Sequence, residues 1–228
     1  MPTKDSLKKA IEKRKEREKQ LRIEDILAAA QTAFLVKGFF GVTMDDIAIE
    51  AGFTKPTIYK YFKSKEELFG RLIIPVITEL RDQLVYVEQQ ISEKRYQSAA
   101  ELLHEFFQAT YNGYCKSPES FRIIQIFQQS GDIWKISTEM RAELNTLGKT
   151  NANRGRQIVR LAIEQGLIVK YDEIELLDVL YSVFTGLIQV SDIKSHRGGY
   201  RQEKGTTEAG FLNRLALAEQ LLINALST

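Results

Sequence analysis

The sequence predicts an all-α protein, and three observations carry that prediction. Apolar residues recur with helical spacing along almost the whole chain. No segment of useful length alternates polar and apolar residues as a half-buried strand does. Only 4 prolines interrupt 228 residues. With 43% hydrophobic and 27% charged residues, the chain resembles an average soluble protein that buries a core.

The first predicted helices are short and carry clear end signals. One apolar stripe starts at Ile23 and reaches Phe34, and Gly38 is suited to cap that helix at its C-terminus. Thr43 is a predicted N-cap for a helix over about residues 44–51, and Asp46 stands three residues later. Gly52 ends this second helix.

Two further helices with clear end signals follow. Thr54 is expected to cap a third short helix with Pro56 in its first turn. Ser64 and Glu67 form a second capping-box pattern at the start of a long helix, in which Pro75 predicts a kink. Later helices are predicted over about 95–115, 119–130, 136–166, 172–193 and 207–226.

The charge is unevenly distributed. Residues 1–21 carry eight basic and four acidic side chains, a net charge of +4, although the whole chain carries +2. Residues 53–65 contain four lysines and no acid. Two short basic segments on an acidic body predict a localised polyanion-binding face, whereas residues 1–21 taken alone are more typical of a solvated polar tail or helix.

Residues 43–62 have the layout of a helix-turn-helix, two short helices joined by a tight turn at Gly52. Ala48 and Ala51 are small enough to let the helices cross closely. Apolar residues occupy the inner positions, whereas the outer positions of the second helix carry cations and hydroxyl groups that suit phosphates and base edges. Those outer residues are Lys55, Thr57, Tyr59, Lys60 and Tyr61.

The stretch from Ile26 to Leu68 resembles the DNA-binding domain of TetR-type repressors. The matching positions are Ile26-Leu27, Ala30, Phe34, Gly38-Phe39, Val42-Thr43, Asp46-Ile47-Ala48, Ala51-Gly52, Thr54-Lys55-Pro56-Thr57-Ile58-Tyr59, Tyr61-Phe62 and Ser64-Lys65-Glu66-Glu67-Leu68. They cover about the first third of the chain and join cap, turn and core positions.

The resemblance implies a homodimer whose two reading helices enter successive major grooves of a palindromic operator in double-stranded DNA. By position, Thr43 would bond a phosphate, as would Lys65, Tyr59 and Tyr61. The residues that would face bases or backbone are Lys55, Thr57 and Lys60. Some members of the family carry a polar or basic residue at the position of Asp45. Asp45 departs from that pattern, and its negative charge would repel phosphate.

Enzyme chemistry is not expected. Gly148-Lys149-Thr150 resembles the end of a phosphate loop, but Glu143 stands where the first glycine is needed. His104 has no second histidine four residues on. A single cysteine, Cys115, and two histidines are too few for a metal cluster, so we expect neither a metal nor a cofactor.

The C-terminal part contains candidates for a small-molecule site. Asn151 and Arg154 fall on the apolar stripe of the predicted 136–166 helix, where a buried guanidinium needs a carboxylate, a carbonyl or a ligand. An internal salt bridge and a ligand anchor are equally good interpretations. The other predicted pocket residues are Tyr111, Phe121, Phe127 and Trp134.

The last two helices carry more apolar surface than one side of a domain needs. In the resembled family these helices pair as a four-helix bundle in the dimer. The predicted interface residues are Leu177, Tyr181, Phe184, Ile188, Leu215 and Leu222.

We therefore expect a basic arm (1–21), a helix-turn-helix DNA-binding domain (22–70) and a ligand-binding and dimerisation domain (71–228). The predicted function is a transcriptional repressor that a small lipophilic or aromatic effector releases from DNA. A constitutive DNA-binding protein without a ligand is the alternative, and a helical enzyme or carrier is a weaker one. The polar N-terminus and the lack of a long apolar run predict a cytoplasmic protein without a membrane span.

Overall fold

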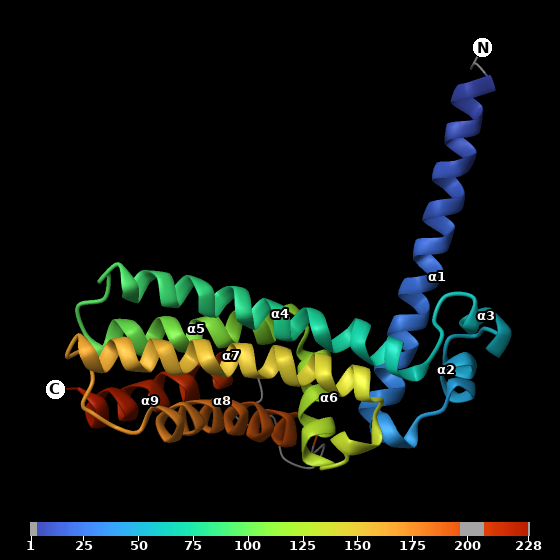
Figure 1. Ribbon diagram of the computed structural model, residues 1–228. Coiled ribbons are helices and arrows are strands. Elements are labelled where there is room, and N and C mark those ends of the chain that lie inside the picture. Colours follow the sequence, from blue (N-terminus) through green and yellow to red (C-terminus); the bar gives the residue numbers. More distant parts are fainter. Residues whose placement is uncertain (1–3, 197–207, 228) are drawn as a thin grey trace. The chain divides into compact units, whose positions relative to one another are not determined.

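The computed structural model describes residues 4–196 and 208–227, and its regular elements within those ranges are helices (Figure 1). The all-α prediction is confirmed. The helices are α1 (Lys4–Gly41), α2 (Met44–Glu50), α3 (Lys55–Tyr59), α4 (Lys65–Ser92), α5 (Ala99–Lys116), α6 (Pro118–Gln129), the 3-10 helix η1 (Ile133–Lys135), α7 (Thr138–Glu164), α8 (Glu173–His196) and α9 (Glu208–Leu226).

The chain divides into two compact units. The first contains the chain up to Val76 together with Ser117–Asn145, and the second contains Ile77–Lys116 together with the chain from Thr146 onward. Helices α4 and α7 therefore contribute to both units. This division rests on packing alone and does not test the predicted boundary between the DNA-binding domain (22–70) and the rest of the chain, which remains a prediction.

In the first unit, α1 begins far earlier than the apolar stripe predicts. The stripe starts at Ile23, yet the helix begins at Lys4, so the basic arm and the first helix are continuous. At the other end, Gly38 adopts φ 66° and ψ 168°, a left-handed φ that glycine takes at little cost, and one further turn follows to Gly41. Helix α1 packs against α2 and α6.

An aromatic cluster forms the centre of this unit. Phe39 lies 4.7 Å from Phe69 and 5.8 Å from Phe127 between ring centroids, and Phe34 meets Phe69 edge-on at 5.8 Å. All four rings are buried. The cluster joins α1, α4 and α6, and such contacts add to the stabilisation that burial of the rings provides.

The predicted N-cap positions are confirmed, and two of the three carry a side-chain capping bond. Thr43 and Asp46 form a complete capping box at α2. At α4, Ser64 Oγ accepts a hydrogen bond from the amide of Glu67. Thr54 stands at the N-cap of α3, but its side chain makes no capping bond.

The second unit packs α5, α8 and α9 together, with α8 and α9 running side by side (Figure 1). Its fully buried side chains include Phe107, Ile158, Phe184 and Ile188. The segment Glu173–Ile193 of α8 is long and apolar enough to cross a membrane by those two criteria, and only 22% of that window is buried. Most of this apolar segment is therefore not covered by the core of the protein.

Candidate nucleic-acid interface and effector region

Helices α2 and α3 form the predicted helix-turn-helix. Gly52 adopts φ 67° in the turn between them, which explains why glycine stands there. The amide of Phe53 donates a 2.9 Å hydrogen bond to the carbonyl of Ala48, which closes the end of α2. Ile47 and Ile58 are fully buried on the facing sides of the two helices. The outer side of α3 is thereby presented to solvent.

The seven residues predicted to contact DNA gather on this element and beside it. Four are exposed, namely Thr43, Lys55, Tyr59 and Lys60. The other three are half-buried, namely Thr57, Tyr61 and Lys65. Several of these seven residues also form hydrogen bonds with different parts of the protein.

Lys55 is held by an acid from the neighbouring helix. Its ammonium donates a 2.8 Å hydrogen bond to Oδ2 of Asp45, and both side chains are substantially exposed. This contact raises the pKa of Lys55. Asp45 therefore does more than repel phosphate: it neutralises a cation on the reading helix and fixes its direction.

The hydroxyl groups of the interface also have neighbours. The Oγ1 atoms of Thr54 and Thr57 lie 2.9 Å apart, so the Thr54 hydroxyl bonds the reading helix instead of capping it. Tyr61 Oη accepts from the guanidinium of Arg22 at 3.5 Å. Sequence reasoning missed Arg22, and the excess of basic residues just before it was the available signal.

Lys65 has a structural contact that limits its freedom. Its Nζ donates a 2.8 Å hydrogen bond to the carbonyl of Val42 and lies 4.5 Å from the centre of the Phe39 ring. Burial lowers the pKa of this lysine. Part of its hydrogen-bonding capacity thus ties the start of α4 to the loop before α2.

The six predicted ligand residues belong to both compact units. Phe121, Phe127 and Trp134 belong to the first, and Tyr111, Asn151 and Arg154 to the second. Phe127 is part of the aromatic cluster, and Phe121 is also buried. Trp134 is 64% exposed, so within its own unit it lies on the surface.

Asn151 and Arg154 have protein partners in the second unit. The amide of Asn151 donates a 3.0 Å hydrogen bond to the carbonyl of Ile77, and the guanidinium of Arg154 forms an ion pair with Glu88 on α4. Of the two interpretations of Arg154, the geometry matches the internal salt bridge. Tyr111 Oη donates to Glu208 at 2.8 Å, and its ring stacks on Phe211.

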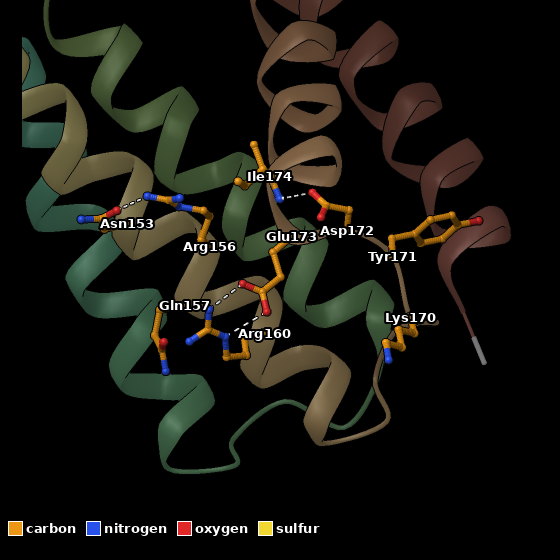
Figure 2. A pocket seen from close by; sticks show the side chains of 9 residues that line it. All are labelled: Asn153, Arg156, Gln157, Arg160, Lys170, Tyr171, Asp172, Glu173 and Ile174. Atoms are coloured by element: carbon orange, nitrogen blue, oxygen red, sulfur yellow. Dashed lines mark hydrogen bonds and ion pairs between the residues drawn. The ribbon is translucent and has the colours of Figure 1, made fainter.

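Two hollows of the second unit are lined by other residues. One is an apolar void of about 20 Å³ enclosed by side chains of α5, α7, α8, α9 and the loop before α8, including Phe106, Val159 and Leu180. The other is an open groove of about 1050 Å³ (Figure 2). Its charged groups are mostly paired, because Arg160 binds Glu173 through two nitrogens and Asp172 accepts from amides at the start of α8.

The predicted dimer residues are not all available to a partner. Phe184 is 1% exposed, and Ile188 and Leu215 are equally well buried within the single chain. Their assignment to an interface needs correction, because a side chain covered by its own protomer has no surface left to lose. Tyr181 is exposed, and Leu177 and Leu222 are half-buried.

Other exposed apolar residues share one face of α8. Val179, Val190 and Ile193 are each at least two-fifths exposed, and Gly186 between them has open space beside it. Their spacing of seven, four and three residues keeps the four on one side of the helix. On α9, Leu217 and Leu221 are exposed one turn apart.

Within the described ranges, no group of three His, Cys, Asp or Glu side chains is placed to hold a metal ion. The thiol of Cys115 is exposed.

Comparisons with known proteins agree with this geometry. The family described as "Bacterial regulatory proteins, tetR family" matches residues 26–72. The uncharacterized HTH-type transcriptional regulator YfiR of Bacillus subtilis is 47% identical over 55 residues, which are 24% of this chain and 27% of YfiR. The chain thus spans about a quarter of that curated relative's length.

Solved structures extend the likeness to the whole fold. The TetR family regulator PfmR of Thermus thermophilus matches with a TM-score of 0.65 and 21% identity, over 89% of this chain and 99% of PfmR. A Clostridium perfringens putative fatty acid metabolism regulator matches with a TM-score of 0.65 and 19% identity, over 90% and 99%. Residues 26–72 therefore match the tetR family of bacterial regulatory proteins, and about nine-tenths of the chain shares the fold of solved TetR-family regulators.

Proposed function

We propose that this protein is a cytoplasmic, homodimeric transcriptional regulator that binds a palindromic operator and is released from it by a small lipophilic or aromatic ligand. The observation that carries the DNA-binding part is the capped helix-turn-helix, whose α3 exposes Lys55 and Tyr59 beside the half-buried Thr57 and is followed directly by the exposed Lys60. This arrangement supports contacts with phosphates and base edges.

Selection of bound duplexes from a pool with a randomised core tests this part. Wild type should enrich a palindrome. Lys60→Gln should weaken binding to all sequences, since it removes a cation that binds phosphate, and the slope of log K against log salt should become shallower by about 0.9 for each phosphate released. Thr57→Ala should change the enriched sequence instead. A wild-type protein that enriches no sequence would contradict the proposal.

The exposed apolar faces of α8 and α9 support the dimer. A partner that covers Val179, Val190 and Leu217 would remove apolar surface from water, and Gly186 would let a partner helix approach closely. We assign the interface to these exposed residues. Leu222 remains a predicted member, whereas Leu177 and Tyr181 stand on the opposite side of α8 from Val179.

The apolar void inside the second unit supports a lipophilic ligand. One similar structure is described as a putative fatty acid metabolism regulator, which agrees with that class. Opening of the void would couple ligand binding to a state with lower DNA affinity, provided that the ligand binds that state more tightly.

The size of the void favours a second candidate, a constitutive DNA-binding protein without an effector. About 20 Å³ holds roughly one water molecule, whereas sites for drug-sized ligands usually enclose about 300–1,000 Å³. Native mass spectrometry of the purified protein distinguishes the two. A bound lipophilic compound that lowers operator affinity supports the regulated form, and an empty protein that no fatty acid or steroid stabilises supports the constitutive one.

A further inference from the structure

The helical arm carries a row of cations on one face. Lys8, Lys15, Lys19 and Arg22 follow one another at intervals of seven, four and three residues, so their side chains project from the same side of α1, which also carries one acid, Glu12. All four are exposed. Ile26 continues the row four residues later and is fully buried. The basic row is therefore the solvent-exposed continuation of the face by which α1 packs on its own domain.

Two other arm cations are neutralised by acids one turn away. Lys9 pairs with Asp5 at 3.3 Å, and Arg14 pairs with Glu18 at 2.8 Å. In the row itself, Lys19 pairs with Glu16 at 3.6 Å, and Arg22 interacts electrostatically with Glu18. Such exposed ion pairs contribute little to stability, so the cation can readily exchange its acidic partner for another anion.

The row points to the same side of the domain as the reading helix. Arg22, its last member, contacts the hydroxyl of Tyr61 just after α3, and both belong to the first compact unit. Figure 1 shows the arm, in dark blue, extending well past α2 and α3. From Lys8 to Arg22 the helix rises about 21 Å, a length that matches roughly six base pairs of one DNA strand.

We propose that this basic row of α1 is a second DNA-binding surface, which contacts phosphates outside the half-site that α3 reads. The proposal rests on the proposed DNA-binding function and deepens it. DNA is the occupant that fits, because the row is continuous with the helix-turn-helix surface and presents cations at a spacing suited to a phosphate backbone. The contacts would add affinity without reading sequence, because phosphates carry no direct sequence information.

The arm itself offers a matched control. Lys13 and Arg17 are also exposed and one turn apart, but they project from the opposite face. The variants Lys8→Gln/Lys15→Gln and Lys13→Gln/Arg17→Gln remove the same charge from the same helix. Circular dichroism should show equal helix content in both, because glutamine is a good helix former.

Binding is measured against salt on two duplexes that carry the palindrome enriched by wild type, one with about 12 flanking base pairs on each side, twice the length that the row spans, and one with none. On the long duplex, Lys8→Gln/Lys15→Gln should make the salt slope shallower by about 1.8 per arm, whereas the control pair should change it little. On the short duplex, the two variants should bind alike.

Two results would overturn the proposal. Equal slopes for the two variants on the long duplex would mean that the arm acts only through its overall charge. An equal reduction in affinity on both duplexes would place the contact inside the half-site. A wild type that enriches no palindrome would instead contradict the DNA-binding function itself, so the two failures are distinguishable.

Discussion

Asp46 connects three groups around the start of the helix-turn-helix. Its carboxylate accepts from Lys37 at 2.6 Å and from both the amide and the hydroxyl of Thr43. These bonds, with that of Lys37 the largest cause, hold the pKa of Asp46 well below its usual 3.8. A single carboxylate thus caps α2 and ties it to α1.

The lowered pKa predicts how stability depends on pH at this residue. A carboxyl whose pKa is depressed by folding stabilises the protein above its unfolded pKa, and this contribution is lost as pH falls through the folded value. Asp46→Asn should therefore lower the Tm at pH 7, and the gap to wild type should narrow below about pH 4. Thermal unfolding followed by circular dichroism, from about pH 3 to neutral pH, measures this. A gap that is constant over that range would mean that the charge of Asp46 contributes nothing.

Arg154 is expected to act through its salt bridge. Arg154→Met keeps the aliphatic stem but leaves Glu88 without its partner, which should cost about 2 kcal/mol at this half-buried site, between the values for exposed and buried pairs. Denaturant unfolding measures the loss. Glu88→Gln should cost a similar amount, and the double variant should cost less than the two losses combined. Normal stability with a weakened response to a ligand would instead restore the anchor role.

At the scale of the helices, α2 and α3 are joined by a charge pair as well as by apolar packing. Asp45 holds Lys55, the first residue of the reading helix. We expect Asp45→Asn to raise affinity for operator and random duplexes alike and to steepen the salt slope by about 1, because it frees one cation for phosphate. Fluorescence anisotropy at several salt concentrations checks this.

Glu50 provides the control for this prediction. It is an exposed acid at the other end of α2. Glu50→Gln changes the net charge of the protein by the same amount without releasing Lys55, so it should leave the slope nearly unchanged. The same effect from both variants would show that the Asp45–Lys55 contact has no specific role.

For the whole molecule, we expect the exposed apolar residues of the second unit to set the oligomeric state. Leu217 is 61% exposed in the single chain, so Leu217→Glu should leave the protomer folded but place an unpaired charge in the dimer interface, at a cost of several kcal/mol. Sedimentation should show a monomer, and operator affinity should fall because two heads are needed for two half-sites.

Two further variants make this test specific. Tyr86→Glu changes an exposed aromatic residue of α4 outside the proposed interface and should remain dimeric. Phe184→Asp should unfold the protein instead, since that ring is a core residue. A dimeric Leu217→Glu protein would move the interface to another face.

Features that depend on neighbouring residues could be predicted without any structure. The capping box of Thr43, the turn at Gly52 and the helical period of the later segments are local signals, and the structure contains all of them. The arm shows the limit of that information. Its charged residues lack an apolar stripe, so the apolar pattern predicted a helix that begins only at Ile23. In the structure the helix begins at Lys4, because helix propagation and i,i+4 ion pairs stabilise the charged segment.

Only the tertiary structure shows which apolar residues the chain itself buries and which charged residues pair within the chain. An apolar stripe does not reveal whether the chain itself or a second molecule covers it, so Phe184 and Leu217 were indistinguishable in the sequence. In the same way, Arg154 finds Glu88 at a distance of 66 residues along the chain, and Phe127 joins a cluster with Phe39 and Phe69. Such pairings depend on how distant helices pack, and helix packing is set by the shapes of whole surfaces that no local pattern specifies.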